Sequence, residues 1–453
     1  MEISTTSKAT NIDLLDFKSP QMRAFHITWL TFFLCFFGWF GVAPLMAIVR
    51  EELQLTKMQI GNIVIASVIM TVFARLLIGW LCDRIGPRIT YTVLLLLGSL
   101  PVMLIGLSNS YESFLLFRLG IGVIGASFVI TQYHTSVMFA PNIVGTANAL
   151  SAGWGNLGGG VTQMVMPLVF SAFVGLGYID SEAWRYAMVV PGAALFIMAF
   201  VYYFYTQDTP EGNILDLRKT NASYQAKKKD MDGSFLNACR DYRVWILFLI
   251  YGCCFGVEIT IDNIAALYFM DEFNLSLAQA GFIAGAFGMM NLFARALGGI
   301  FGDRAGNKYG LKGRVIILAG FLFMEGLGLM LFSSMGVLVF SIISMIVMAF
   351  FVKMSNGATY SVVPFINKNA MGAVSGIVGA GGNAGAVMAG FLLKAEGVSY
   401  REGLFVIGIV VAAVSAFALL IRFPSEETKE NLARAKEEVT PVEQAPELAV
   451  VVD

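Results

Sequence analysis

The sequence predicts an all-α membrane protein with twelve transmembrane helices in two pseudo-symmetric six-helix bundles. Hydrophobic residues make up 57% of the 453 residues and charged residues only 13%, and the mean hydropathy is +0.72. These values exclude an ordinary soluble protein. Apolar runs of roughly 20 residues, the length that crosses a bilayer, recur twelve times. A motif of the first half returns in the second half, which indicates a duplicated chain.

The expected spans follow from these runs in chain order. They cover residues 24–48, 59–81, 89–108, 113–138, 143–173, 184–205, 243–269, 277–301, 314–333, 336–364, 371–393 and 402–422. The first six would form an N-terminal bundle over 24–205 and the last six a C-terminal bundle over 243–423, with a polar linker over 206–242. Residues 1–23 and 424–453 would be solvated tails. The polar N-terminus has no small-residue cleavage site, so we expect no removable signal peptide.

Charged connections predict the orientation of the chain. Basic residues collect on one side of the predicted membrane and acidic residues on the other. Because cytoplasmic loops are enriched in Lys and Arg, we expect both termini and the linker in the cytoplasm, with the protein in the inner or plasma membrane. The net charge of −1 argues against a nucleic-acid partner. The basic residues are Arg84, Arg88, Arg218, Lys219, Lys227, Lys228, Lys229, Arg304, Lys308, Lys312 and Arg314.

The residue types give no sign of a metal or cofactor site. The five cysteines lack zinc-ligand spacing. The chain has only two histidines in total, and they do not form a haem-type pair. No glycine-rich loop follows a strand, as a nucleotide site would require. We therefore expect free thiols, no metal, no cofactor and no enzymatic activity.

Each half carries one arginine inside an apolar span. Arg75 and Arg295 are 220 residues apart, and so are Gly79 and Gly299, four residues further on. An arginine near the bilayer centre costs about 2.5 to 3.5 kcal/mol, so its repetition at matched depth favours a function over side chains that snorkel to the surface. Two planar, forked cations facing across a pseudo-twofold axis suit a small, flat oxyanion. The glycines would leave space beside the guanidinium groups.

Glycine-rich stretches also recur, from Ala152 to Gly160 in the fifth span and from Gly379 to Ala386 in the eleventh. Small residues let membrane helices approach and slide, so we expect these blocks to serve conformational change. An asparagine in hydrocarbon must bind a neighbour or a substrate, and for Asn156 both interpretations stay open. The conformational candidates are Gly153, Gly155, Gly158, Gly159, Gly381, Gly382, Asn383 and Gly385.

Two acidic-basic pairs, Asp83 with Arg84 and Asp303 with Arg304, follow the two arginines at the same spacing. They are either interfacial charges without a dedicated role or gating residues that make a helix-end contact, and their duplication favours gating. The loop Gly79–Arg88, its echo Gly299–Lys308 and the stretch Arg118–Ala126 resemble signature sequences of the major facilitator superfamily. That resemblance implies the major facilitator fold, with two bundles that rock about a central site.

The glycine blocks themselves resemble the paired signatures of the nitrate/nitrite porter family, and the surrounding sequence resembles its high-affinity nitrate-uptake branch. The resemblance covers essentially the whole membrane portion. It implies that Arg75 and Arg295 clasp nitrate, or nitrite, with Asn156 and Tyr251 as polar contacts. The stretches that carry it are Ser127–Val129, Gln132, Tyr133, Ser136, Gly153–Pro167, Trp245, Tyr251, Gly252, Gly256–Glu258, Asp262, Asn263 and Asn291–Gly299.

Titratable residues inside the predicted spans indicate how transport would be driven. An anion that enters against an inside-negative potential is opposed by about 2.3 kcal/mol per 100 mV. Glu258 and Asp262 lie one turn apart in the seventh span, and His134, Lys353 and Glu325 lie in others. We predict proton symport, with Glu258, Asp262, Lys353 and His134 as coupling candidates. For each acid a permanent ion pair stays an alternative, as does an ordinary helix hydrogen bond for His134.

Three further functions compete with proton-coupled nitrate import. A nitrate/nitrite exchanger would move no net charge and would need no intramembrane acids. A porter for another small monovalent anion, such as formate, would also use arginine, but the paired glycine blocks argue against it. A non-transporting nitrate sensor ranks last, because neither the linker nor the tail is long enough to form a recognisable signalling domain.

Overall fold

The computed structural model describes residues 7–220, 234–275, 277–367, 370–393 and 398–423, and these ranges are largely helical. Eleven helical segments there have the length and hydropathy to cross a membrane. Helix α3 (Lys57–Ile85), with 29 residues, is also long enough to do so. The tail expected over 424–453 lies outside the described residues.

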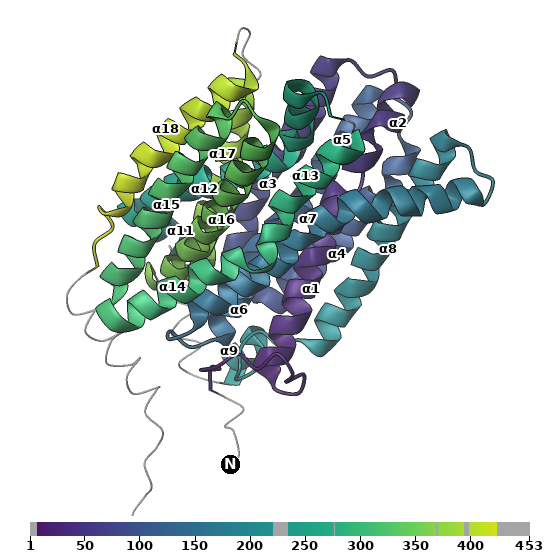
Figure 1. The fold of residues 1–453 in the computed structure, drawn as a ribbon. Coiled ribbons are helices and arrows are strands. Elements are labelled where there is room, and N and C mark those ends of the chain that lie inside the picture. Colours follow the sequence, from purple (N-terminus) through teal and green to yellow (C-terminus); the bar gives the residue numbers. More distant parts are fainter. Residues whose placement is uncertain (1–6, 221–233, 276, 368–369, 394–397, 424–453) are drawn as a thin grey trace, which may run out of the picture.

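The helices fall into two halves, which Figure 1 shows beside each other in purple to teal and in green to yellow. The first half contains α1 (Pro20–Phe40), α2 (Met46–Glu52), α3, α4 (Pro87–Leu104), α5 (Tyr111–Gly122), α6 (Ser127–Met138), α7 (Val144–Gly175) and α8 (Asp180–Tyr205). The second contains α12 (Tyr242–Phe273), α13 (Leu277–Met289), α14 (Ala294–Tyr309), α15 (Leu311–Ser334), α16 (Leu338–Val362), α17 (Met371–Leu393) and α18 (Tyr400–Ala418). The segment of the chain that connects the two halves contains the short helices α9 (Ile214–Thr220) and α11 (Ser234–Arg240).

Three of the expected spans are broken by short 3-10 turns. The first divides at Ala43–Leu45, where Pro44 lacks the N–H that an α-helix would use. The fourth divides at Val123–Ala126, where a Cβ on Gly125 would lie 2.6 Å from the side chains of Thr71 and Trp39. The eighth divides at Met290–Leu292, and the indole Nε1 of Trp154 donates to the carbonyl of Leu292, 3.3 Å away. The last break ends just before Arg295.

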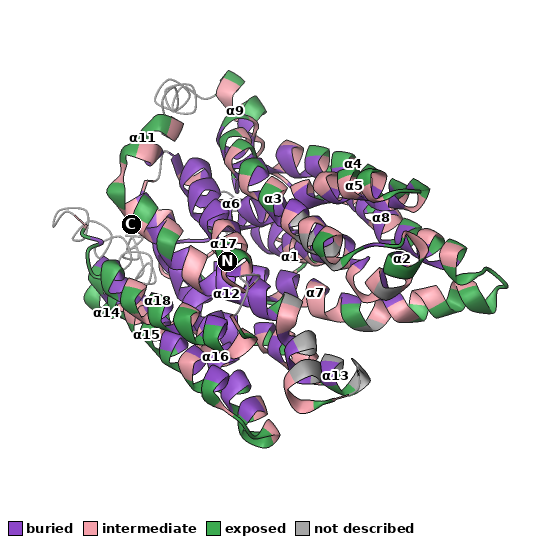
Figure 2. Ribbon diagram, turned by 90° about the horizontal axis from the view of Figure 1, so that it is seen from above, coloured by how far each residue is buried: buried purple, intermediate pink, exposed green. Residues whose placement is uncertain are grey.

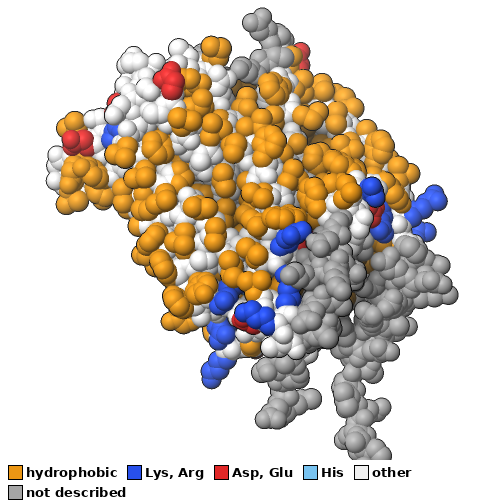
Figure 3. Space-filling view, turned by 180° about the vertical axis from the view of Figure 1, so that it is seen from behind, with side chains coloured by type: hydrophobic (Ala, Val, Ile, Leu, Met, Phe, Trp, Pro, Cys, Tyr) orange, Lys and Arg blue, Asp and Glu red, His pale blue; other side chains and the backbone are white. Residues whose placement is uncertain are grey.

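The molecule has a buried interior and an exterior on which many large apolar side chains are exposed. Figure 2 shows buried residues gathered on α6, α12 and α17, whereas α4, α15 and α18 carry many exposed residues on their outer faces. Figure 3 shows that much of the exterior is hydrophobic, with Lys and Arg gathered toward one end. We call this the basic end; its described residues include Arg84, Arg218, Arg304, Lys308 and Lys312. An apolar exterior on long helices identifies an integral membrane protein.

The halves meet where glycine lets two backbones touch. Helix α3 packs against α17, and α14 packs against α7. A Cβ on Gly299 would lie 2.5 Å from the carbonyl oxygen of Gly145 and 2.7 Å from the Cβ of Ala149, and Gly79 faces the carbonyl of Gly372 in the same way. The expectation that Gly79 and Gly299 leave space beside the arginines was therefore wrong. Backbone of the opposite half fills that space.

Gly299→Ala is expected to destabilise this arrangement by about 1 to 3 kcal/mol, as overpacking does in a filled interior. The new methyl group would meet backbone of α7, which cannot rotate away, so α7 and α14 would have to separate. Thermal unfolding in detergent measures the effect as a lower Tm. Gly320→Ala is the matched control, because a Cβ there meets nothing within 4 Å. Equal Tm values for the two variants would contradict the tight contact.

Candidate anion-binding site

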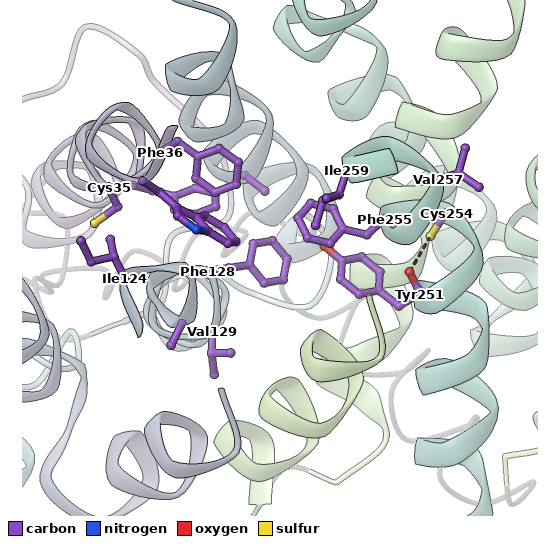
Figure 4. Packing of buried hydrophobic residues seen from close by; sticks show 14 of the residues in the cluster. Cys35, Phe36, Ile124, Phe128, Val129, Tyr251, Cys254, Phe255, Val257 and Ile259 are labelled. Atoms are coloured by element: carbon purple, nitrogen blue, oxygen red, sulfur yellow. Dashed lines mark hydrogen bonds between the residues drawn. The ribbon is translucent and has the colours of Figure 1, made fainter. Parts of the chain in front are cut away.

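Aromatic rings from both halves meet at the centre of the molecule. Figure 4 shows Phe128 of α6 pointing across toward Tyr251 and Phe255 of α12. The ring centroids of Phe128 and Phe255 are 5.8 Å apart at 18°, and those of Tyr251 and Phe255 are 5.1 Å apart at 7°. Tyr360 of α16 meets Phe128 edge-on at 4.9 Å. The rings provide flat, apolar walls across the junction of the two halves.

Both predicted arginines flank this ring cluster. The guanidinium carbon of Arg75 lies 5.0 Å from the Phe128 centroid and 5.2 Å from that of Phe255. For Arg295 the corresponding distances are 5.6 and 5.9 Å. The side chains are buried, with 0% and 1% exposure. The structure therefore brings one arginine from each half to the same two aromatic rings, within the range of cation–π attraction.

Arg75 is held without an acidic partner among the described residues. Its Nε donates to the carbonyl of Gly125 at 3.1 Å, and Nη1 donates to the carbonyl of Gly379. With the amide of Asn383 turned so that its oxygen faces the guanidinium, that oxygen accepts from Nη1 at 3.0 Å and from Nε at 3.2 Å. Nη2 is buried and has no hydrogen-bond partner in the described part of the chain. A buried N–H without an acceptor is costly, so this atom is a donor available to a ligand.

Arg295 has different surroundings. Its Nη2 donates to the hydroxyl of Tyr251 at 3.1 Å, and its Nη1 lies 3.5 Å from Oε2 of Glu258. The latter distance is at the long limit of a hydrogen bond. Glu258 contacts Lys353 more closely, at 2.8 Å. Tyr251, predicted from the family resemblance, thus touches one of the two predicted arginines.

Glu258 accepts contacts from four other elements. Its Oε1 receives the side-chain amides of Asn156 on α7, 3.2 Å away, and Asn291, 3.0 Å away in the turn before α14. The amide of Asn356 on α16 donates to Oε2 at 2.7 Å. The sequence left two roles open for Asn156, as a ligand of the substrate or as a structural hydrogen-bond donor. In the structure its amide donates to a carboxylate. The sequence analysis did not predict Asn356. Its position inside an apolar span, three residues after Lys353, is the signal that could have identified it.

Among the side chains that contact the rings or Glu258, basic groups outnumber carboxylates. Arg75, Arg295 and Lys353 are buried cations, and Glu258 is the carboxylate that contacts two of them. Burying unbalanced charge in a membrane is expensive. A bound monovalent anion would reduce the imbalance, so the arrangement is suited to binding one.

The remaining coupling candidates lie in different places. Asp262 is exposed, one turn from Glu258 on the side away from the basic end. His134 lies outside this cluster: its Nδ1 is 2.6 Å from the hydroxyl of Tyr202 and its Nε2 is 2.8 Å from the carbonyl of Gln207. These contacts tie α6 to the end of α8, which matches the ordinary structural alternative for His134.

At the basic end, two aspartates each accept hydrogen bonds from the opposite half. The carboxylate of Asp83 accepts from the backbone N–H groups of Gly372 and Ala373 at 3.0 and 2.9 Å. Asp303 accepts from Gly145 and Thr146 at 3.1 and 2.5 Å. Each carboxylate thereby satisfies unpaired N–H groups at the start of a helix in the other half. These contacts join the two halves at the basic end.

The basic members of the four gating candidates do not share these contacts. The guanidinium of Arg84 lies over the ring of Trp80, 4.7 Å from its centroid, and Arg304 is exposed. Arg314, which we had used only for orientation, donates to Asp303 instead. Its Nη2 also reaches the carbonyl of Pro141, 3.0 Å away in the opposite half.

The glycine blocks surround the ring cluster and bring helices together. A Cβ on Gly153 would lie 2.6 Å from the carbonyl of Asn291, and one on Gly382 would lie 2.6 Å from the ring of Phe255. Among the other glycines predicted to serve conformational change, those of the α7 block face α1 and those of the α17 block face α12. These glycines, with their contacts, are Gly155 at Phe32, Gly158 at Phe33, Gly159 at Phe36, Gly381 at Phe248 and Gly385 at Gly252.

Comparison with known proteins fits this geometry. The family model of the Major Facilitator Superfamily matches residues 28–390 and 265–451. The "High affinity nitrate transporter 2.5" of Arabidopsis thaliana is 41% identical over 428 residues, which cover 94% of this chain and 84% of that protein. The "Nitrate/nitrite transporter NrtP" of Picosynechococcus is 28% identical and covers 81% of this chain and 84% of its own length.

Solved structures agree on the fold. The proton:xylose symporter XylE superposes with a TM-score of 0.68 at 14% sequence identity, over 88% of this chain and 95% of that one. The human organic anion transporter MFSD10 gives a TM-score of 0.63 at 12% identity, over 88% of this chain and 100% of that one. The chain has two halves with an arginine pair between them, and it is 41% identical to a high-affinity nitrate transporter over 94% of its length. It therefore belongs to the nitrate/nitrite porter family of the Major Facilitator Superfamily.

Proposed function

We propose that this protein is a secondary active transporter that imports nitrate, with nitrite as a second candidate substrate, by alternating access coupled to protons. The observation that carries the proposal is the pair of buried guanidinium groups, one from each half, beside the same aromatic rings. The names of the relatives support nitrate as the cargo. The absence of an acidic partner for Arg75 among the described residues supports an anion at this position.

Nitrate fits the chemistry of the site. It is flat, carries one negative charge and offers acceptor oxygens in a plane. The free Nη2 of Arg75 and the guanidinium of Arg295 provide donors from opposite halves, and the faces of Phe128 and Phe255 exclude water. Low local polarity strengthens such charge-assisted hydrogen bonds. An anion bound to both halves would favour conformations in which the halves approach each other.

Alternating access would then require the basic end to open. The contacts of Asp83 with α17 and of Asp303 with α7 would have to break, so that α3 and α14 could move away from the opposite half. The gathering of Lys and Arg at this end supports a cytoplasmic position for it and for both termini, because cytoplasmic loops are enriched in these residues. The glycines at the crossings would let the helices slide during this movement.

Proton coupling is supported by carboxyl groups at two depths. Asp262 is exposed and Glu258 is buried one turn away, in contact with Arg295. This order would carry a proton from water to the anion site. A driver of this kind is needed because the membrane potential opposes the entry of nitrate.

Uptake by purified protein in proteoliposomes tests the proposal. We expect nitrate to accumulate when the outside is acidic relative to the lumen, without a counter-anion inside. Uptake that depends on nitrite loaded in the lumen and ignores the pH gradient would establish the exchanger instead. Formate that binds well and is not displaced by nitrate would establish a porter for another anion. Binding of nitrate without any transport would leave the sensor.

A further inference from the structure

The carboxylate of Glu258 lies in a site built for an anion. Three asparagine amides, one lysine and one arginine direct N–H groups at its two oxygens, at distances from 2.7 to 3.5 Å. The donors come from α7, the turn before α14, α14 itself and α16. Glu258 is 1% exposed. A structural ion pair needs one cation, whereas this carboxylate has five donors from four elements.

Two of these donors are also the predicted ligands of the substrate. Arg295 and Asn156 were expected to bind nitrate, and both contact Glu258. A carboxylate resembles nitrate in the features that such donors recognise, because each presents two oxygens in a plane with one delocalised negative charge. The Arg295 part of the site therefore already contains an anionic group, the carboxylate of Glu258. In the Arg75 part of the site, no acidic side chain of the described residues contacts the guanidinium, and Nη2 is unpaired.

We infer that Glu258 is a tethered competitor of nitrate, which occupies the Arg295 part of the site until a proton neutralises it. This inference rests on the proposed transport of nitrate. One proton binds a Glu258 oxygen, the neutral carboxyl gives up Arg295 and the amide of Asn156, and one nitrate takes these donors together with Arg75. The charge of the site is unchanged, because one anion replaces another. After nitrate and the proton leave, the carboxylate returns to its donors.

The charged and titratable groups around Glu258 fit this exchange. Arg295 and Lys353 face it from α14 and α16, and Asp262 and Tyr251 lie on its own helix. Glu325 on α15 is also buried, and it interacts electrostatically with both Glu258 and Lys353. Helices α13 and α17 contain no titratable side chain, and α7 and the turn before α14 contribute amides. Lys353 stays charged throughout, so the neutralised carboxyl keeps one neighbour to which it can return.

Nitrate binding to the purified full-length protein, measured by calorimetry across pH, tests the inference. If one proton binds with each nitrate, the Kd should rise about tenfold per pH unit above the titration range of Glu258. Glu258→Gln imitates the neutral carboxyl and should bind nitrate tightly with a flat pH profile. Glu272→Gln, which changes a carboxyl paired with Arg401 near the C-terminal end of α12, should keep the slope of the unmodified protein. An unchanged slope in Glu258→Gln would overturn the inference.

A measurement on the unmodified protein guards against a variant that does not fold. Calorimetry in buffers with different ionisation enthalpies reports the protons taken up with each nitrate, and we expect about one. Uptake of no protons would overturn the tethered competitor while leaving nitrate transport intact. A failure of the unmodified protein to bind nitrate at any pH would instead overturn the proposed function, and the inference with it.

Discussion

Arg75→Lys and Arg295→Lys are each expected to lower nitrate transport by about 10- to 150-fold in a protein that still folds. Lysine keeps the positive charge but replaces a planar fork with a single point donor, and so loses bidentate contact with a flat anion. A charge-assisted hydrogen bond contributes about 1.5 to 3 kcal/mol, and about 1.4 kcal/mol corresponds to a factor of ten. Initial uptake rates in proteoliposomes measure the loss.

Arg88→Lys is the matched control for these substitutions, because Arg88 lies at the basic end, over the ring of Tyr203, 4.5 Å from its centroid. It should transport at a rate close to that of the unmodified protein. Size-exclusion chromatography establishes that all three variants are folded. Near-normal uptake by either of the two site variants would show that a point charge is sufficient, and the paired-guanidinium account would fail.

Lys353→Met is expected to destabilise the protein by about 3 kcal/mol. The ammonium group is fully buried and lies 2.8 Å from Glu258, and removal of one member of a buried ion pair leaves the other insufficiently compensated. The double variant with Glu258→Gln should lose less stability than the sum of the two single losses, because each single variant already removes the same ion pair. Chemical or thermal unfolding in detergent, as a double-mutant cycle, measures the coupling between the two residues.

Arg401→Met provides the comparison for this cycle. Arg401 pairs with Glu272 at 2.6 Å, but both side chains are partly exposed, at 31% and 25%. Ion pairs in contact with water contribute about 0 to 1 kcal/mol, so the loss should be small. If Lys353→Met and Arg401→Met were equally mild, or if the losses of Lys353→Met and Glu258→Gln were simply additive, the ion pair between the two residues would not contribute to stability.

The sequence was most informative where duplication exposed a pattern. Arg75 and Arg295 stand at the same distance before Asp83 and Asp303, and the structure places each arginine at the rings and each aspartate at a helix of the other half. Spacing along one helix predicts depth in the membrane, because each residue adds about 1.5 Å. Depth alone does not say which neighbour fills the space beside a residue, and that is why Gly79 and Gly299 were misinterpreted.

Partners on separate helices were the part that the sequence could not provide. Glu258 is surrounded by Asn156, Asn291, Lys353 and Asn356, which come from three elements distant in the chain. Lys353 and Asn356 share one span, but no periodicity links them to Asn156, Asn291 or Glu258. Breaks inside spans were equally hidden, because hydropathy does not distinguish a continuous helix from one interrupted by a 3-10 turn such as Met290–Leu292.

The number of nitrate ions that bind at equilibrium tests the central claim most directly. If Arg75 and Arg295 hold one shared ion, calorimetry should give one nitrate per protein, and each lysine variant should lose most of the affinity. The variant with both substitutions should lose little more than either alone, because the two side chains act on the same ion. Two nitrate ions per protein, with one site retained in each single variant, would contradict a shared clamp.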